Sequence, residues 1–424
     1  TTIIDQNADN VRKIIETPAE HGKVVLEHHS NLTPDKETHR HNLLAENWDA
    51  PIVFTTQVQF LEALFGAGTR DARRMHQLAN SVIIMDEVQT VPIKIVHMLN
   101  AALRFLTHDC GATVVLCTAT QPPLDKLPQN PYRALTIQDE QKIIRNEAEL
   151  FEKLKRVEVY DERKPGGWTN AEIVDLAQKA LDEKGSVLIV VNTRASALTL
   201  YQEIKSHNLS TALYHLSTNM CPAHRKDKLD EIKAKLEAKE PVICVSTQLI
   251  EAGVDIDFGA VIRALAGLDS ITQSAGRCNR HGLREDGGIV WVVNPKLENL
   301  DRLKDIKVGR DQAERVLDDF KNSPDTFGND PIGIDAIASF YNYYYNSQKE
   351  NMNYPVSATS EIGRNDNLFN LLSMNELSVK AYKATHQGDA PEILMRQSFK
   401  SAAEQFRVID SPTRGVVVPY GDGK

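Results

Sequence analysis

The sequence has little cysteine, no long apolar run and no excess of positive charge. Only five of the 424 residues are cysteine, and no two of them form a C-x-x-C pair, which argues against a cysteine zinc motif and against a disulfide framework. No apolar run approaches the length of a membrane span, and the first residues carry no signal-peptide pattern. These absences predict a cytoplasmic protein with no membrane partner.

The net charge of −9 counts, taken alone, against nucleic-acid binding. It does not exclude such binding, because backbone amides and hydroxyl groups in a local groove can hold a single strand. The hydrophobic fraction of 41% and the charged fraction of 25% are ordinary for a globular protein, and 424 residues suffice for two or three domains. The chain opens at Thr1 in apolar text that we interpret as a strand, so we expect a fragment of a longer protein.

Short Val- and Ile-rich runs alternate with amphipathic stretches up to about residue 298. The apolar runs are continuous, as expected of strands in a parallel sheet that is covered on both faces. We predict strands at 51–54, 81–85, 113–117, 186–191, 241–245 and 288–293. We predict helices at 92–106, 170–183 with Thr169 as the N-cap, 195–207 and 224–239. The alternation occurs twice, which indicates an α/β fold.

The regions outside this alternation are a linker and a C-terminal part. The polar stretch 161–168, which contains Pro and Gly, is the expected linker between the two α/β units. After residue 295 the strand pattern stops, and 297–321 and 331–349 are predicted helices. The tyrosines of the second helix are expected to pack in a core rather than to stack on bases. Two late runs, 406–410 and 415–419, are predicted strands.

Two adjacent carboxylates, Asp86 and Glu87, follow the predicted strand 81–85. A nucleotide hydrolase needs one acid that holds Mg²⁺ through water and another that orients or deprotonates the attacking water. We assign the first role to Asp86 and the second to Glu87, and we expect Gln89 to contact ATP. An isolated acid pair is more often a turn, so the assignment depends on the motifs around it.

Hydroxyl and amide side chains follow several other predicted strands. By themselves they are ordinary strand-to-helix turns, but their order along the chain makes them a set. Hydroxyl groups at such positions suit contacts with nucleic-acid phosphates. The candidate nucleic-acid contacts are Thr55, Thr56, Gln57, Thr118, Thr120, Asn192, Thr193, Ser246 and Thr247.

The run from Gln273 to Arg280 is the most specific signal in the sequence. Arg277 and Arg280 lie three residues apart, which predicts that they share one face of a helix. Such arginines can reach a γ-phosphate held by the other α/β unit and neutralise its developing charge. The alternative is a basic surface helix. The candidate ATP contacts are Gln89, Gly253, Asp255, Gln273, Arg277 and Arg280, with Gly253 and Asp255 in a tight turn.

The motifs T-T-Q, D-E-V-Q, T-A-T, S-T-Q-x-x-E-A-G-V-D and Q-x-x-G-R-x-N-R occur in the order found in superfamily 2 helicases. Residues 1–6 and 26–31 and the closing runs 397–400, 406–410 and 418–421 resemble the CRISPR-associated helicase-nuclease of type I systems. The resemblance implies two tandem RecA-like domains with parallel sheets. The first would cover 1–160 incompletely and the second 168–298, followed by a helical connector and a truncated C-terminal accessory domain at 299–424.

The same resemblance implies an ATP- and Mg²⁺-dependent motor. It would move 3′ to 5′ along single-stranded DNA displaced by a guide-RNA surveillance complex and unwind target DNA for an attached metal-dependent nuclease in antiviral defence. Two alternatives stay open. One is a superfamily 2 DNA or RNA helicase outside CRISPR immunity, and the other is a non-enzymatic module that binds nucleic acid or a partner.

Two parts expected of this family are absent from the 424 residues. No G-x-x-x-x-G-K-[ST] phosphate loop occurs, since the Gly-Lys pairs at 22–23 and 423–424 lack its other residues. A nuclease site would need several His and Asp residues, and the lone His108-Asp109 pair is interpreted as a loop. We therefore expect the isolated chain to be inactive, with both parts supplied in cis or by another chain. Histidines 28, 29, 39 and 41 have no ligand spacing, which argues against a metal site there.

Overall fold

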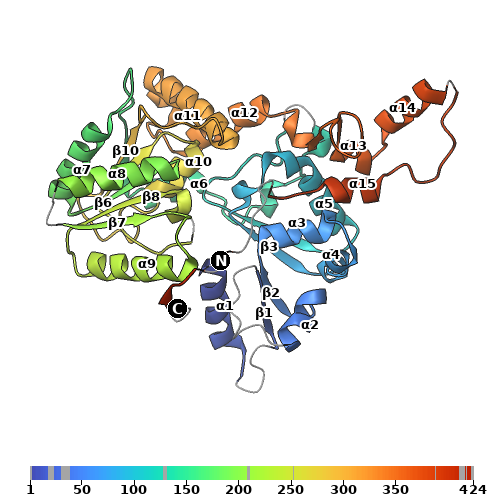
Figure 1. Ribbon diagram of the computed structural model, residues 1–424, viewed down its shortest axis with the longest axis horizontal. Coiled ribbons are helices and arrows are strands. Elements are labelled where there is room, and N and C mark those ends of the chain that lie inside the picture. Colours follow the sequence, from blue (N-terminus) through green and yellow to red (C-terminus); the bar gives the residue numbers. More distant parts are fainter. Residues whose placement is uncertain are drawn as a thin grey trace. The chain divides into compact units, whose positions relative to one another are not determined.

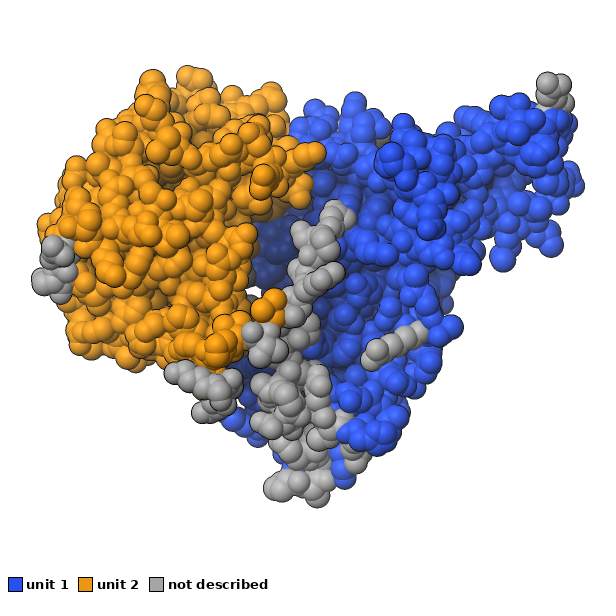
Figure 2. Space-filling model, in the orientation of Figure 1, with its two compact units in different colours: residues 1–141, 345–413 blue, residues 142–344, 414–424 orange. Residues whose placement is uncertain are grey.

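The structure is a computed structural model that describes residues 2–17, 23–29, 39–127, 131–207, 211–251, 253–386, 388–409, 416 and 418–421. By their internal contacts the residues fall into two compact units, which Figure 2 colours separately. Unit 1 comprises residues 1–141 and 345–413, and unit 2 comprises residues 142–344 and 414–424. No helix in the described ranges is long and apolar enough to cross a membrane.

Unit 2 is built on a six-stranded sheet with the strand order β5-β10-β9-β6-β8-β7 (Figure 1). All its pairings are parallel. The central strands β6, β8 and β9 are buried at every position, as expected for a parallel sheet covered on both faces. The strands are β5 (Val157–Asp161), β6 (Ser186–Val191), β7 (Ala212–Leu216), β8 (Val242–Thr247), β9 (Ala260–Ala264) and β10 (Gly288–Val293).

Helices cover both faces of this sheet. One core packs α7 (Asn170–Lys184) and α8 (Arg194–Ser206) on the sheet, and the other packs α9 (Pro222–Glu237) and α10 (Leu268–Ala275) on the opposite face. The predicted N-cap Thr169 is confirmed, since Thr169 and Glu172 form a capping box at the start of α7. Unit 2 also contains α6 (Glu147–Leu154) and α11 (Lys304–Asn322), and α12 (Ile334–Ser347) begins in unit 2 and ends in unit 1.

Unit 1 contains two separate parallel strand pairs. β1 (Val25–His28) pairs with β2 (Ile52–Thr55), and β3 (Val82–Asp86) pairs with β4 (Thr113–Cys117). A short antiparallel pair, β11 (Pro355–Val356) and β12 (Asp366–Asn367), lies near the end of the chain. The helices are α1 (Thr2–Ile15), α2 (His39–Asn47), α3 (Gln57–Phe65), α4 (Thr69–Ala72), α5 (Val96–His108), α13 (Leu368–Leu372), α14 (Glu376–His386) and α15 (Phe399–Gln405).

Short 3₁₀ helices complete both units. They are Met75–Leu78, Val88–Thr90, Ile93–Ile95, Pro131–Arg133, Asp139–Gln141, Gln248–Ile250, Pro324–Phe327 and Asn351–Asn353. All six strands predicted before residue 298 are present, with ends that differ by at most two residues. The prediction that both faces of each strand are covered is wrong for β3, however, because the side chains of Val82 and Ile84 are 69% and 67% exposed. Alternate side chains of a strand share a face, and the described residues leave that face of β3 open.

Three other predictions are wrong. The opening residues form helix α1, because their buried or half-buried apolar positions Ile4, Ala8 and Val11 recur at helical spacing. The helix predicted at 297–321 begins only at residue 304. No strand forms at 406–409, where Phe406 packs against Phe65 instead. Residue 410 and residues 415 and 417 of the last predicted strand lie outside the described residues, and 416, 418 and 419 form no strand.

The contact units differ from the predicted domain limits of 1–160, 168–298 and 299–424. Strand β5 lies inside the predicted first domain, yet it pairs with β10 in the sheet of unit 2. Residues 345–413 belong to unit 1, where the amide oxygen of Asn353 accepts a 2.9 Å hydrogen bond from His97 Nδ1. The domain limits 1–160, 168–298 and 299–424 therefore stay a prediction.

Candidate nucleotide and nucleic-acid site

The acid pair lies at the carboxyl end of β3 in unit 1. Asp86 is the last residue of the strand and is exposed, and its carboxylate accepts a 3.1 Å hydrogen bond from the backbone N–H of Glu87. Glu87 adopts a left-handed conformation, with φ 52° and ψ 47°. Such a conformation costs free energy for a residue other than glycine and is often found at functional sites. The strand end therefore presents two adjacent carboxylates.

Glu87 is linked to the neighbouring strand end through Gln89. The amide of Gln89 donates to the Glu87 carboxylate, and the Thr118 hydroxyl donates to the amide oxygen of Gln89. The backbone N–H of Thr120 in turn donates to the Thr118 hydroxyl at 3.0 Å. Because β3 and β4 pair in parallel, their carboxyl ends meet at one edge. Four predicted site residues are thus brought together.

The second hydroxyl motif of unit 1 follows β2. The Thr55 hydroxyl donates to the carbonyl oxygen of His28 at 2.9 Å, and Thr56 caps helix α3. The side-chain oxygen of Gln57 accepts a weak 3.4 Å hydrogen bond from the hydroxyl of Thr90. Thr90 directly follows Gln89, the last residue of the motif that contains the acid pair. Gln57 therefore connects the two motifs, whereas Thr56 has a local structural role.

The groups expected to hold a magnesium nucleotide are present only in part. The exposed Asp86 carboxylate at a strand end suits Mg²⁺ bound through water, and Glu87 stands beside it. A phosphate cradle of the G-x-x-x-x-G-K-[ST] type does not occur in the sequence. The described residues therefore fit the metal and water-activating functions but not the grip on the phosphates.

The arginine motif of unit 2 does not lie on a helix, so the predicted shared helical face is wrong. Helix α10 ends at Ala275, and Arg277 and Arg280 lie in the turn that follows. There Cys278 forms a β-bridge with Phe258, and the backbone N–H of Asn279 donates to Phe258 at 2.9 Å. Because Cys278 and Asn279 pair with Phe258 in this way, α10 does not continue past Ala275.

The two arginines have different surroundings. Arg277 is 8% exposed, and its guanidinium donates to the carbonyl oxygens of Ile250, at 3.0 Å, and Glu251. The Arg280 side chain is 38% exposed and forms a 2.8 Å ion pair with Asp255. Although partial burial opposes it, this pairing lowers the pKa of Asp255. Arg280 is thus the accessible cation of the motif, and Arg277 fastens the end of α10 to the turn after β8.

The other predicted nucleotide contacts of unit 2 lie near this motif in the chain. Gly253 has a φ of 79°, as the predicted tight turn requires, and Ala252 lies outside the described residues. Gln273 is half-buried in α10.

A buried ion pair that the sequence reasoning missed lies beneath these motifs. Arg263 on β9 is fully buried and lies 3.0 Å from the Glu251 carboxylate. The hydroxyls of Ser270 and Ser274 donate to the same carboxylate at 2.7 and 2.8 Å. The Arg263 guanidinium also donates to the Asn192 side chain at 2.9 Å. An arginine inside the apolar run A-V-I-R-A was the available signal, because a buried charge requires a partner.

Asn192 and Thr193 follow β6, and a carboxylate occupies their donors. Glu298 accepts hydrogen bonds from the backbone N–H groups of Asn192, at 2.7 Å, and Thr193, at 3.0 Å. It also accepts one from the Asn192 side chain at 2.7 Å. Asn192 and Thr193 are predicted nucleic-acid contacts, and in this structure these donors bind the Glu298 carboxylate.

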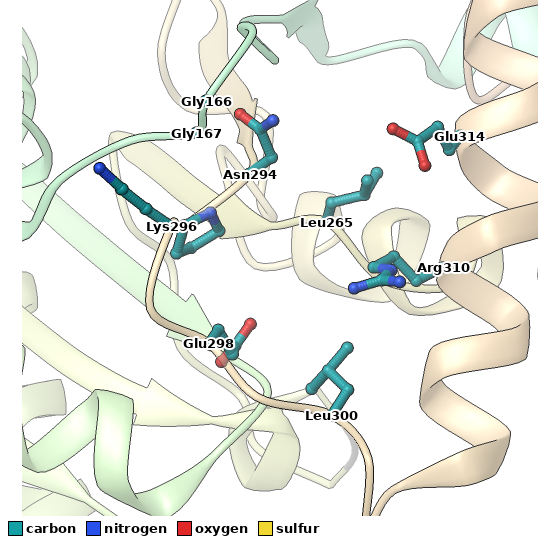
Figure 3. Close-up of a pocket in the computed structure, with 10 residues that line it drawn as sticks. Gly166, Gly167, Leu265, Asn294, Lys296, Glu298, Leu300, Arg310 and Glu314 are labelled. Carbon is teal, nitrogen blue, oxygen red and sulfur yellow. The ribbon is translucent and has the colours of Figure 1, made fainter.

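Glu298 also lines a pocket of about 370 Å³ in unit 2 (Figure 3). The pocket includes Leu265 and Asn294, which directly follow β9 and β10, so it lies at the carboxyl edge of the sheet, where α/β folds bind ligands. Arg310 extends from α11 toward the pocket. Its remaining lining residues are Gly166, Gly167, Pro295, Lys296, Leu300 and Glu314.

The hydroxyl pair after β8 is less accessible than predicted. Ser246 is fully buried, and its hydroxyl donates to the carbonyl oxygen of Thr247 at 2.8 Å. Thr247 is 7% exposed. The burial of Ser246 does not suit a direct phosphate contact, which leaves Thr247 as the candidate at this strand end.

Comparisons with known proteins agree with this geometry. A family model described as the C-terminal part of the CRISPR-associated nuclease/helicase Cas3 matches residues 183–283. The Cas3 protein of Haloferax volcanii is 28% identical in a match covering 62% of this chain and 37% of the relative. The fold of the chain (Figure 1) resembles a crystal structure of T. fusca Cas3 with AMPPNP. The TM-score is 0.61 and the sequence identity is 19%, and the match covers 83% of this chain and 48% of that chain.

A chain in a CRISPR RNA-guided surveillance complex in a pre-nicking state is also similar, with a TM-score of 0.53 and 17% identity, over 94% of this chain and 52% of that chain. The chain therefore spans about half the length of these solved relatives and about a third of the curated one. The fold class expected from the sequence, α/β with tandem RecA-like domains, is confirmed.

Proposed function

We propose that the chain is a member of the Cas3 helicase family and forms the motor part of a CRISPR helicase-nuclease, which its similarity to Cas3 proteins supports. The motor uses ATP and Mg²⁺ to move along single-stranded DNA in the cytoplasm and unwinds target DNA for a nuclease. The AMPPNP in the T. fusca relative supports the nucleotide assignment. The relative in a guide-RNA surveillance complex supports such a complex as the partner.

The residues of the chain divide the hydrolysis step between them. Bound Mg²⁺ would neutralise charge on the phosphates, as in other nucleotide hydrolases. Asp86 would hold the metal through water, and Glu87 would orient the attacking water and take its proton. Arg280 supplies positive charge to the transferred phosphate. Arg277 positions this motif through the carbonyl groups that it holds.

Strand contact is made mainly with phosphates, by hydroxyl, amide and backbone groups at the strand ends. In unit 1 these are Thr55, Gln57 and the Thr118 region, and in unit 2 they are Thr193 and Thr247. A surface without many cations suits the net charge of −9. Binding of this kind tolerates different base sequences, since phosphates carry no sequence information.

The sequence of 424 residues lacks the phosphate loop, and this favours a second reading of the isolated chain as a binding module. Phosphoryl transfer depends mainly on positioning and charge stabilisation. Without a grip on the β- and γ-phosphates, the acid pair and the arginine have no positioned substrate. We therefore expect hydrolysis only when a phosphate loop is supplied in cis or by another chain.

The observation that carries the proposal is the hydrogen-bonded link from Glu87 through Gln89 to Thr118. It connects the water-activating acid to a predicted strand contact, so DNA binding can change the position of that acid. In the protein completed with a phosphate loop, Thr118→Val should therefore reduce the factor by which single-stranded DNA stimulates hydrolysis. Thr107→Val is the matched control, because among the described residues the Thr107 hydroxyl donates to carbonyl groups of its own helix α5 and to no other element. Full stimulation in Thr118→Val would contradict the proposed coupling.

A further inference from the structure

Three metal-ligating side chains converge in unit 1, away from the acid pair. Asp5 lies in α1, Glu27 lies in β1, and His29 follows β1 directly. Their ligand atoms all lie within 4.8 Å of one another. His29 Nε2 lies 3.2 Å from Asp5 Oδ1 and 3.5 Å from Glu27 Oε2. Helix α1 contacts β1, as Figure 1 shows at the lower part of the view.

The burial of this cluster distinguishes it from an ordinary acidic surface. The side chain of His29 is 0% exposed and that of Glu27 is 1% exposed, while Asp5 is 37% exposed. Buried ionisable groups are paired with opposite charges or coordinate metals. The other carboxylate oxygen of Glu27 accepts from Arg12, which also pairs with Asp9 at 2.9 Å. Arg12 therefore occupies one side of Glu27, and Oε2 faces His29.

The distances suit a tetrahedral metal. Bonds of about 2.0–2.2 Å from zinc to histidine nitrogen and carboxylate oxygen place neighbouring ligand atoms about 3.3–3.6 Å apart in a tetrahedron. The separations of 3.2 and 3.5 Å from His29 Nε2 are close to this range. One imidazole nitrogen with two carboxylate oxygens suits Zn²⁺ or Mn²⁺, whereas Mg²⁺ and Ca²⁺ prefer oxygen ligands alone.

We propose that Asp5, Glu27 and His29 bind a divalent first-row transition metal, with Zn²⁺ as the best match to the geometry. The partly exposed side of Asp5 leaves room for water as a further ligand. The sequence argument against a metal at the histidines considered ligand spacing along the chain. It is revised for His29, because the other two ligands come from α1 and β1 and form no short motif.

The metal has a structural consequence for the nucleic-acid site. It ties α1 to the carboxyl end of β1. The residue before His29 is His28, whose carbonyl oxygen accepts the 2.9 Å hydrogen bond from the Thr55 hydroxyl. Binding of the metal therefore steadies the strand ends that carry Thr55. This inference does not depend on the proposed helicase activity, since the cluster lies within unit 1 and needs no nucleotide.

The test is titration of the EDTA-treated chain, with no histidine tag, by Co²⁺ as a spectroscopic substitute for Zn²⁺. Every sample carries Asp86→Asn, so that the acid pair contributes no metal site. We expect one equivalent of Co²⁺ with the visible absorption of a four-coordinate N/O site, and its displacement by Zn²⁺. Binding should weaken toward acid pH, because a metal needs the deprotonated form of its ligands.

The variants separate this site from incidental binding. His29→Ala and Asp5→Asn should each weaken Co²⁺ binding by more than about 100-fold, since even loss of an outer-shell partner costs about 10- to 100-fold. Asp5→Asn keeps the proposal testable if the buried His29→Ala variant does not fold, because Asp5 is partly exposed. His76→Ala, which changes an exposed histidine of the same unit, should bind Co²⁺ normally. Absence of the band, or a band unchanged in Asp5→Asn, would overturn the site and leave an ion pair of His29 with the two acids.

Discussion

Replacing Glu251 by alanine should destabilise unit 2 far more than loss of a surface ion pair does. The change leaves Arg263 fully buried without its 3.0 Å carboxylate and removes the acceptor of the Ser270 and Ser274 hydroxyls. Breaking a buried pair by removing one partner costs about 3–5 kcal/mol, because an uncompensated charge stays in the interior. We therefore expect a loss of about 4 kcal/mol, which is a large fraction of an ordinary domain's stability.

The assay is hydrogen exchange of β9 and β6 peptides in the full chain, read as a free energy of local opening. Glu231→Ala is the matched control, since Glu231 forms a 2.7 Å ion pair with Lys228 on the surface of the same unit. A surface pair of this kind is worth about 0–1 kcal/mol. The double variant Glu251→Leu/Arg263→Met should lose less than Glu251→Ala, because it removes the unpaired charge. The reasoning is refuted if Glu251→Ala costs no more than the control.

Three further predictions concern single side chains of unit 2. In the protein completed with a phosphate loop, Arg280→Ala should lower kcat by about 10³-fold or more without loss of stability. Arg277→Ala should lower both kcat and the free energy of unfolding. Equal effects of the two variants on stability would contradict the division of roles. Glu298→Gln should tighten single-stranded DNA binding, measured by fluorescence anisotropy, because a neutral amide accepts a weaker hydrogen bond from the Asn192 side chain than the Glu298 carboxylate does. Unchanged affinity would count against the Asn192 side chain as a phosphate contact. Burial raises the pKa of Asp269 to about 6, so its contribution to stability is full below its ordinary pKa of 3.8 and is lost as the pH rises through about 6; Asp269→Asn should flatten the pH dependence of unfolding between about pH 4 and 7, and an unchanged profile in denaturant titrations would disprove the assignment.

The parts of the fold that sequence reasoning predicted depend on local patterns. Strand β10 and strand β6 are continuous apolar runs, and the Thr169 cap is visible within three residues of sequence. The opening helix was misassigned because its short apolar start was weighed without the helical recurrence of Ile4, Ala8 and Val11. The exposed face of β3 could not be foreseen, since the run containing Val82 and Ile84 gives no sign of what covers it.

The parts of the site that sequence reasoning missed depend on contacts between distant residues. The motif order identified Glu87 and Gln89, but not the hydrogen bond that joins Gln89 to Thr118. Nor does sequence spacing reveal that Glu298 reaches Asn192 across more than one hundred residues. The predicted helical face of the arginines failed because a β-bridge in three dimensions ends the helix first.

The most direct test of the account is phosphate release with ATP, Mg²⁺ and single-stranded DNA. It is measured for residues 1–424 alone and for the same residues together with a phosphate-loop segment in cis or as a second chain. Glu87→Gln serves in both cases as the control for contaminating ATPases. The account predicts no DNA-stimulated release from the chain alone, and release with the segment that Glu87→Gln abolishes. Robust release from the chain alone that Glu87→Gln abolishes would contradict it.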